Sequence, residues 1–387
     1  MKKIDEILNH CVNLQASDIF LRPGGPVYAR ILREIVPIEE FGKFTVPDIE
    51  EFIREITPEN ILPIFLERKD ADFTVYRPDS GRFRVSLLYQ RNNPAVVLRH
   101  IKPVPETFEE LNLPPDPLKK LCHEQNGIIM LTGTTGSGKS TTIAAMLQYI
   151  NHHFNKHILT LEDPIEAIFF DDKSIFNQRQ IGLDVSNYQV ALRQAILQSP
   201  DIIYVANVRD KETMEAVLTA AETGVLVFGT LHTNNAVQSI ERMVSFFPPH
   251  QGDDIRRRLS LLLKGVISLK LIRRKDGKGL VPAYEILILT PTTASIIRDN
   301  ELSKLPRYIE DGGIYGMSSL KQSLANLVRA GIISKSTAIK YAESKDELLL
   351  ALPDIPDDDD NTDEGTYGHG IGPDEGPTPT IVGEYEL

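Results

Sequence analysis

Eight consecutive residues, 133–140, have the types and spacing of a loop that binds phosphate. They read G-T-T-G-S-G-K-S and satisfy the pattern G-x-x-x-x-G-K-[ST]. Glycines let the backbone turn tightly and bring successive N–H groups onto phosphate oxygens. In such a loop Lys139 reaches the β and γ phosphates, and the hydroxyl of Ser140 ligates Mg²⁺. The predicted contacts with a nucleoside triphosphate are Gly133, Thr134, Thr135, Gly136, Ser137, Gly138, Lys139, Ser140 and Thr141.

The segments on either side of this loop support that interpretation. Residues 128–132 are apolar and partly β-branched, which predicts a short buried strand that ends where the glycines begin. Residues 141–149 are compatible with a helix, whose N-terminus would add a dipole and free N–H groups at the same anion site. A glycine-rich turn without a ligand is the alternative, and the strand–loop–helix order argues against it.

Composition and length indicate a soluble globular protein with two or three domains. The chain has 387 residues, of which 41% are hydrophobic and 25% charged. The two cysteines, Cys11 and Cys122, lack metal-ligand spacing, so we expect neither a disulfide framework nor a zinc site, in line with a reducing cytoplasm. No apolar run reaches the roughly 18 residues of a membrane span, and the N-terminus lacks the apolar core of a signal peptide. We therefore expect a cytoplasmic protein that meets a membrane only through partners.

The net charge of −12 comes from one end of the chain. Residues 351–387 hold 11 acidic residues and no Lys or Arg, which leaves 43 acidic against 42 basic residues in the rest. A nearly neutral body has no bulk positive field that would attract nucleic acid, so we expect no nucleic-acid partner.

Residues 1–103 predict a small α+β domain. Helical spacing marks 4–12 and 46–56, and strand-like stretches follow proline, glycine or polar breaks. Prolines cluster in 104–117, which we interpret as a linker. The expected strands are 16–22, 27–38, 72–76, 81–89 and 95–101.

Residues 118–352 alternate between strands and helices, which predicts a mainly parallel sheet covered on both faces. After about residue 248 the pattern becomes largely helical, and 254–271 is expected to be one helix. The other expected strands are 158–161, 202–205, 225–230 and 281–289, and the other expected helices are 188–197, 211–222 and helices within 316–343.

The tail, residues 353–387, is rich in Asp, Gly, Pro and Thr and has too few apolar groups to offset the entropy of ordering. We expect it to be disordered. Two roles stay open for it: a solvated tail that maintains solubility, or a docking segment around Tyr367 or 381–387.

Four stretches downstream of the phosphate loop occur in the order in which one family of ATPases carries them. Together with the loop they resemble the secretion ATPase superfamily of type II and type IV secretion, and within it the type IV pilus retraction motors of the PilT/PilU type. The resemblance runs from about residue 4 to about residue 350 and implies a RecA-like P-loop NTPase domain behind a PAS-like α+β domain. The stretches are T-L-E-D-P-I-E at 160–166, N-Q-R at 177–179, S-P-D-I-I-Y-V-A-N-V-R-D at 199–210, and T-A-A-E-T-G at 219–224 running into G-T-L-H-T at 229–233.

The resemblance also implies roles for individual side chains. Glu162 and Glu166 fall in an acidic box beside the nucleotide, and Glu166 aligns with the general base for the attacking water. His232 aligns with a histidine that senses the γ-phosphate. Arg84 and Arg99, 15 residues apart in the first domain, align with arginines that contact phosphate, a role for which Arg82 competes.

The chain departs from the family at the Walker B segment. The family carries Gly-Glu there, whereas this chain has Ala206-Asn207. Asn207 has a similar size but no charge, and the loss could cost on the order of 10²-fold in rate while ATP binding survives. Two smaller departures are Phe20, where the family has His, and residues 292–299, which keep Arg298 but little else of a family motif.

The family pattern implies an ATP- and Mg²⁺-dependent hexameric motor for pilus retraction, of one chain or mixed with a related motor ATPase. It would act on an inner-membrane platform protein from the cytoplasmic side. The alternative is an ATP-binding accessory subunit of the PilU type with impaired hydrolysis. Asn207 favours the alternative. The motor is favoured by five intact residues of the family pattern: Lys139, Ser140, Glu162, Glu166 and His232.

Overall fold

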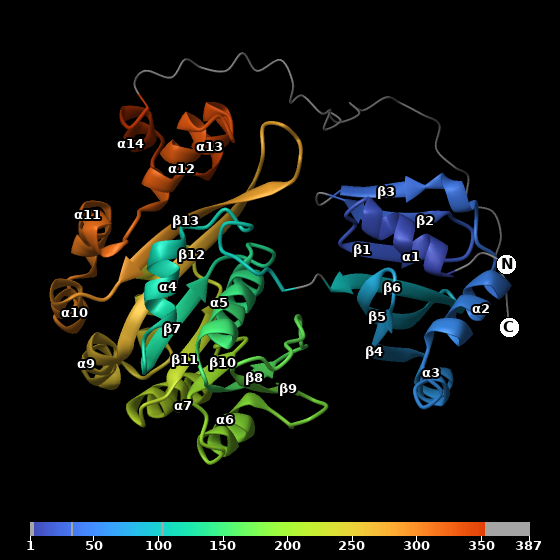
Figure 1. The fold of residues 1–387 in the computed structure, drawn as a ribbon, viewed down its shortest axis with the longest axis horizontal. Coiled ribbons are helices and arrows are strands. Elements are labelled where there is room, and N and C mark those ends of the chain that lie inside the picture. Colours follow the sequence, from blue (N-terminus) through green and yellow to red (C-terminus); the bar gives the residue numbers. More distant parts are fainter. Residues whose placement is uncertain (1–3, 32–33, 102–103, 353–387) are drawn as a thin grey trace, which may run out of the picture.

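The computed structural model describes residues 4–31, 34–101 and 104–352, which fold around two β-sheets (Figure 1). An antiparallel six-stranded sheet lies in the N-terminal region, residues 4–101, with the strand order β3-β2-β1-β6-β5-β4. A seven-stranded sheet lies in the C-terminal region, residues 104–352, with the order β13-β12-β7-β11-β10-β8-β9. Each sheet has its own hydrophobic core. The predicted α/β class is confirmed.

The N-terminal sheet buries one face under helices. Phe83, Val85 and Leu87 alternate with more exposed residues along β5 and pack with Ile7 and Phe52 from the helices. The helices are α1 (Ile4–Asn13), α2 (Val46–Ile56) and α3 (Leu62–Arg68). The strands are β1 (Asp18–Leu21), β2 (Val27–Ile31), β3 (Glu34–Ile38), β4 (Asp70–Arg77), β5 (Gly81–Gln90) and β6 (Asn93–Ile101).

Two features of this region differ from the prediction. The stretch 27–38, expected as one strand, is the hairpin of β2 and β3, which pair antiparallel. The short helix α3 was not predicted, because it has only seven residues and holds Pro63 near its start and the charged Glu67 and Arg68 at its end. A PAS-like relationship of this region stays a prediction.

The C-terminal sheet is parallel except for its edge strand β13, which agrees with the predicted mainly parallel sheet. Every residue of β7, β10 and β11 is buried, as expected for strands covered on both faces. The strands are β7 (Gly127–Thr132), β8 (His157–Glu162), β9 (Ile175–Gln180), β10 (Ile202–Val205), β11 (Leu226–Leu231), β12 (Leu263–Arg273) and β13 (Leu280–Ile288).

The expected helix 254–271 is wrong in its second half. Helix α9 ends at Leu262, and the chain continues directly as β12 between β7 and β13. The stretch 263–271 mixes apolar residues with Lys264, Ser268 and Lys270, and its apolar positions also fit the helical spacing of the preceding helix. The helices of this region are α4 (Pro115–Cys122), α5 (Lys139–His153), α6 (Tyr188–Ile196), α7 (Lys211–Glu222), α8 (Ala236–Ser245), α9 (Gly252–Leu262), α10 (Pro291–Arg298), α11 (Leu305–Asp311), α12 (Leu320–Arg329), α13 (Lys335–Tyr341) and α14 (Lys345–Leu350).

The predicted domain boundaries at 103, 117 and 352 stay predictions, although α4 begins at Pro115, inside the segment expected as a linker. The predicted tail, 353–387, lies outside the described residues. Within the described ranges, no helix has both the length and the apolar character needed to cross a membrane.

Candidate active site

The loop between β7 and α5 has the backbone that the glycine pattern predicts. Gly133 has a φ of +139°, and a Cβ there would lie 2.5 Å from the carbonyl oxygen of Leu269. Gly138 caps α5 with a φ of +100°. Both conformations favour glycine, because a side chain would meet strain at either position and backbone atoms at the first. The loop is therefore a narrow cradle of main-chain atoms.

Lys139 lies buried across this cradle. Its Nζ donates hydrogen bonds to the carbonyl oxygens of Gly133 at 2.8 Å and Thr134 at 3.0 Å. Burial lowers the pKa of the ammonium group, and the carboxylate of Glu166 acts in the opposite direction. The Oγ of Ser137 is buried and has no hydrogen-bond partner among the described residues. The loop thus holds a positive charge and an unsatisfied hydroxyl.

Glu162 is the buried member of the carboxylate pair. It ends β8, is 3% exposed, and accepts hydrogen bonds from the Thr160 hydroxyl at 2.7 Å and Gln178 Nε2 at 3.2 Å. Its other oxygen accepts from the Glu166 N–H at 3.3 Å. Burial raises its pKa, and these hydrogen bonds lower it in part. Glu162 therefore anchors the loop that carries the more accessible Glu166.

Gln178 on β9 ties the acidic loop to the sheet. Besides Glu162, its side chain donates to the carbonyl of Ala167 at 2.8 Å and accepts from the N–H of Phe169 at 2.9 Å. The sequence alone indicates no role for the motif 177–179. In the structure it lies on β9, which pairs with β8, and Gln178 holds the acidic loop against the sheet.

His232 follows β11, which pairs in parallel with β7 so that Leu231 lies opposite Thr132. The register places His232 beside Gly133, and its imidazole makes a hydrogen bond with the Gly133 backbone. Burial and the charge of Lys139 lower its pKa. The imidazole is therefore neutral at physiological pH.

Asn207 lies two residues beyond the end of β10. Its Oδ1 is buried and accepts no hydrogen bond from any residue that the structure describes. An orphaned acceptor of this kind is uncommon in folded proteins and needs an explanation.

Tyr204 was missed in the sequence, where it reads as one more residue of a buried strand. On β10 it pairs with Thr160 and so shares a face of the sheet with Thr160 and Glu162. Burial raises its pKa strongly, and the charges of Glu162 and Glu166 act in the same direction, while a hydrogen bond to Ser140 acts against them. Its hydroxyl thus lies among the predicted site residues.

Arg84 and Arg99 are neighbours on β5 and β6 of the other sheet. Neither makes a hydrogen bond or ion pair with a described residue of the C-terminal region. Arg84 lies 3.7 Å from Asp72, and Arg99 bonds Asp18 at 2.8 Å. The structure therefore brings Lys139, Glu162, Glu166 and His232 together and leaves the two arginines on their own sheet. Arg82 lies on β5 two residues before Arg84, on the same face of the sheet.

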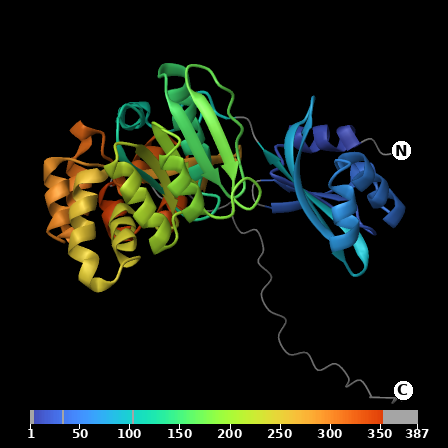
Figure 2. The ribbon, with the colours of Figure 1, turned by 90° about the horizontal axis from the view of Figure 1, so that it is seen from below.

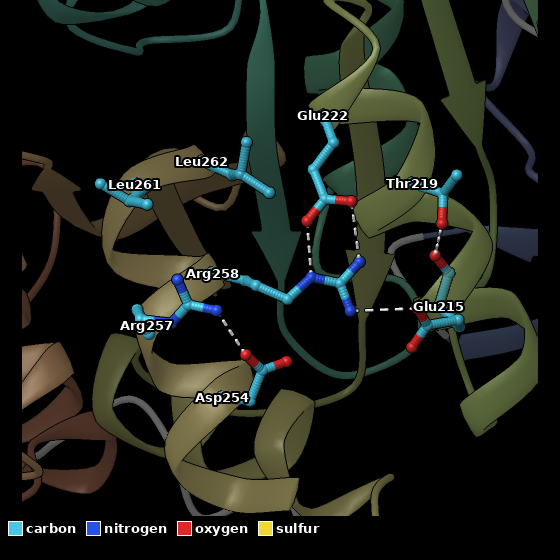
Figure 3. Close-up of a pocket in the computed structure, with 8 residues that line it drawn as sticks. All are labelled: Glu215, Thr219, Glu222, Asp254, Arg257, Arg258, Leu261 and Leu262. Carbon is cyan, nitrogen blue, oxygen red and sulfur yellow. Dashed lines mark hydrogen bonds and ion pairs between the residues drawn. The ribbon is translucent and has the colours of Figure 1, made fainter.

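A surface pocket of about 420 Å³ lies between α7 and α9 and contains none of the predicted site residues (Figure 3). At its centre Arg258 donates to both carboxylate oxygens of Glu222, at 2.6 and 3.1 Å, and to Glu215 at 3.0 Å. These bonds join the two helices. The pocket is a feature of helix packing and is separate from the phosphate loop.

Comparison with known proteins agrees with this arrangement. The family described as "Type II/IV secretion system protein" matches residues 1–300. The chain belongs to this family. The resemblance inferred from the sequence, and with it the ATPase class, is confirmed.

Individual relatives cover most of the chain. It is 35% identical to the type IV pilus ATPase PilU of Pseudomonas aeruginosa over 90% of its length and 91% of that protein. It is 38% identical to the type IV pilus retraction ATPase PilT of the same organism, over 88% of its length and 98% of that protein. A crystal structure of the pilus retraction motor PilT with bound ADP matches with a TM-score of 0.79 and 40% identity, covering 89% of this chain and 98% of that one.

Proposed function

We propose that this chain is a subunit of an ATP-driven motor that retracts type IV pili. The observation that carries the proposal is the convergence of Lys139, Glu166 and His232 on one phosphate loop. The similarity to PilT and PilU, which are pilus ATPases by name, supports the choice of system.

The loop would bind ATP through groups that already point at one another. Phosphate oxygens would replace the two carbonyls as acceptors for Lys139 Nζ, because a charged acceptor makes the stronger hydrogen bond. Ser137 Oγ, buried without a partner among the described residues, would donate to the same phosphates. Thr134, Thr135, Gly136, Gly138 and Thr141 would contribute main-chain N–H groups or hydroxyls.

The residues around Ser140 fit Mg²⁺. Magnesium prefers oxygen ligands and keeps several of its waters. Ser140 would supply a hydroxyl ligand, and the orphaned Oδ1 of Asn207 would accept a hydrogen bond from a metal-bound water. When bound, Mg²⁺ would neutralise charge on the β and γ phosphates.

Hydrolysis would divide the two carboxylates between two roles. Glu162 has every oxygen occupied by hydrogen bonds and a raised pKa, which suits positioning. Glu166 is more accessible and would orient the attacking water and accept its proton. His232, neutral and with a single ring N–H, would turn that N–H from the Gly133 backbone to the γ-phosphate.

The assembly is proposed as a hexameric ring, either of this chain alone or mixed with a related motor ATPase. Arg84 and Arg99 would contact nucleotide phosphates, and closure of the two regions around ATP would produce rigid-body motion. The ring would act on an inner-membrane platform protein from the cytoplasmic side.

A second function rests on Asn207. A neutral amide in place of a carboxylate beside Mg²⁺ favours an accessory subunit of the PilU type, which binds ATP and assists an active motor. The two candidates differ in what the chain does alone.

The test is complementation in a bacterium that lacks its retraction motor. A motor restores pilus retraction when the full chain is expressed alone, and Lys139→Ala abolishes the effect. An accessory subunit restores nothing alone and increases retraction only beside a related active motor. No effect in either background would contradict a role in pilus retraction.

A further inference from the structure

Four charged residues form one row across the N-terminal sheet. Asp18 on β1 lies opposite Arg30 on β2 and Arg99 on β6, and Arg99 lies opposite Arg84 on β5. Residues directly opposite one another share a face of the sheet and have Cβ atoms about 5 Å apart. The row therefore holds three arginines and one aspartate, and Asp18 lies between two of the arginines, Arg30 and Arg99.

The row lies on the face without helices. The neighbouring positions Ile19, Ala29, Leu98 and Val85 point the other way and are buried in the core under α1 and α2. Figure 2 shows these helices on the far side of the sheet from the C-terminal region. An ion pair of 3.7 Å between Glu34 at the start of β3 and Arg273 at the end of β12 also joins the two regions. The charged face is turned toward the region that holds the phosphate loop.

Asp18 is the buried member of the row, 5% exposed. Its Oδ1 accepts a hydrogen bond from Arg99 Nε at 2.8 Å. Its Oδ2 accepts from the hydroxyl of Ser17 at 2.8 Å and lies 3.2 Å from Arg30 Nε. A buried carboxylate is tolerated only when it is paired and hydrogen-bonded, and Asp18 meets both conditions. Its negative charge also offsets the repulsion between the neighbouring guanidinium groups.

The contact uses only one end of the Arg99 guanidinium. Nε is held by Asp18, and the terminal nitrogens make no hydrogen bond or ion pair with a described residue. The side chain is 65% exposed. Guanidinium has five N–H donors in a planar fork, so four stay available once Nε is engaged. Asp18 thus fixes Nε of Arg99 and leaves its terminal nitrogens exposed on the face of the sheet without helices.

We propose that Asp18 is a positioning residue for Arg99 that presents its terminal nitrogens to the phosphates of bound ATP. The inference rests on the proposed function, because it needs a nucleotide polyphosphate as the anion. Holding the side chain before the ligand arrives removes much of the ordering cost of a long, flexible arginine. Arg84, with its terminal nitrogen 3.7 Å from Asp72, lacks such a hydrogen bond and is held less firmly.

The test is a mutant cycle on the full chain. ATP affinity and steady-state hydrolysis are measured for wild type, Asp18→Asn, Arg99→Ala and the double variant. Asp18→Asn should lower kcat/KM for ATP about tenfold, and Arg99→Ala by at least as much. The double variant should equal Arg99→Ala, because Asp18 acts through Arg99. A full additional loss in the double variant, or wild-type kinetics for Asp18→Asn, would overturn the proposal.

Two further variants separate positioning from folding. Arg99→Lys keeps the charge, but one ammonium group cannot bind Asp18 and a phosphate as a fork does, so its loss should approach that of Arg99→Ala. Retained activity in Arg99→Lys counts against the proposal even if Asp18→Asn fails to fold. Asp5→Asn removes a carboxylate that lies 3.7 Å from Arg77 outside the row and should behave as wild type.

The measurements also distinguish this inference from the proposed function. If wild type binds ATP without turning it over, the motor proposal fails, and the same cycle evaluated on ATP affinity still decides the role of Asp18. If wild type binds no ATP, both proposals fail.

Discussion

His232 and Gly133 follow two adjacent parallel strands, and the imidazole hydrogen-bonds the backbone of the glycine. The phosphate loop and the histidine segment are thus joined before any ligand binds. We propose that this contact couples the two segments and lets His232 respond to the γ-phosphate of a bound nucleotide.

Replacing His232 with Gln should lower ATP turnover about 10- to 100-fold while the chain stays folded.

The pKa of His232 lies below its ordinary value of 6.5. The unfolded chain therefore takes up the proton first, and stability is lost as pH falls below about 6.5. Thermal unfolding at pH 5.5 and 7.5 should show a smaller pH effect in His232→Gln than in wild type. An equal pH effect in both would contradict the assignment.

Glu166→Gln should lower the turnover rate by a factor of about 10² to 10⁴. ATP affinity should stay within a few-fold of the wild-type value, because the proposed general base acts on water and not on the nucleotide. Equilibrium ATP binding and steady-state hydrolysis measure the two effects separately. Glu212→Gln, on the exposed first turn of α7, is the matched control. If Glu166→Gln still hydrolyses ATP at the wild-type rate, another residue is the general base.

Gln178→Ala should lower turnover about tenfold, since it removes the hydrogen bonds that tie Glu162 and the acidic loop to β9. Gln194→Ala removes an exposed glutamine on α6 and serves as control. Steady-state kinetics of both variants test the claim. Equal activity would mean that the loop keeps its position without Gln178.

Glu285→Gln should stabilise the chain at pH 8. Burial raises the pKa of Glu285 to about 7, although its carboxylate accepts a hydrogen bond from the Ala236 N–H at 2.7 Å. The unfolded chain ionises near 4.5, so the folded state loses stability as pH rises from about 4.5 to 7, by an amount on the order of 3 kcal/mol.

Urea unfolding at pH 5 and pH 8 measures this loss. Wild type should lose more stability between the two values than Glu285→Gln, since the amide keeps an acceptor for Ala236 but carries no charge at either pH. A larger loss in the variant would contradict the assigned sign.

Contiguous signals were predictable from the sequence, whereas contacts across the sheet were not. The phosphate loop lies within eight residues, and its glycines are required by local backbone conformation, so the pattern alone locates it. Asp18 and Arg99 are separated by 81 positions, and only the pairing of β1 with β6 brings them together. The contacts of Tyr204 and Gln178 were not predictable for the same reason, because strand register determines their neighbours.

Periodicity predicted the wrong element for residues 263–271. They mix apolar residues with Lys264, Ser268 and Lys270, and their apolar positions 263, 266, 267 and 271 also fit a helical spacing. The apolar spacing of α9, which ends at Leu262, continues into this segment, so the two together resemble one helix. The pairing of this segment with both β7 and β13 is a tertiary effect that no local pattern contains.

Steady-state ATP hydrolysis of the purified full chain, measured beside Lys139→Ala and Asn207→Glu, decides between motor and accessory subunit. The unmodified chain should hydrolyse ATP well above the Lys139→Ala background, and Asn207→Glu should raise the rate further. Turnover at background in the unmodified chain, restored by Asn207→Glu while ATP binding is unchanged, would contradict the motor and favour the accessory subunit.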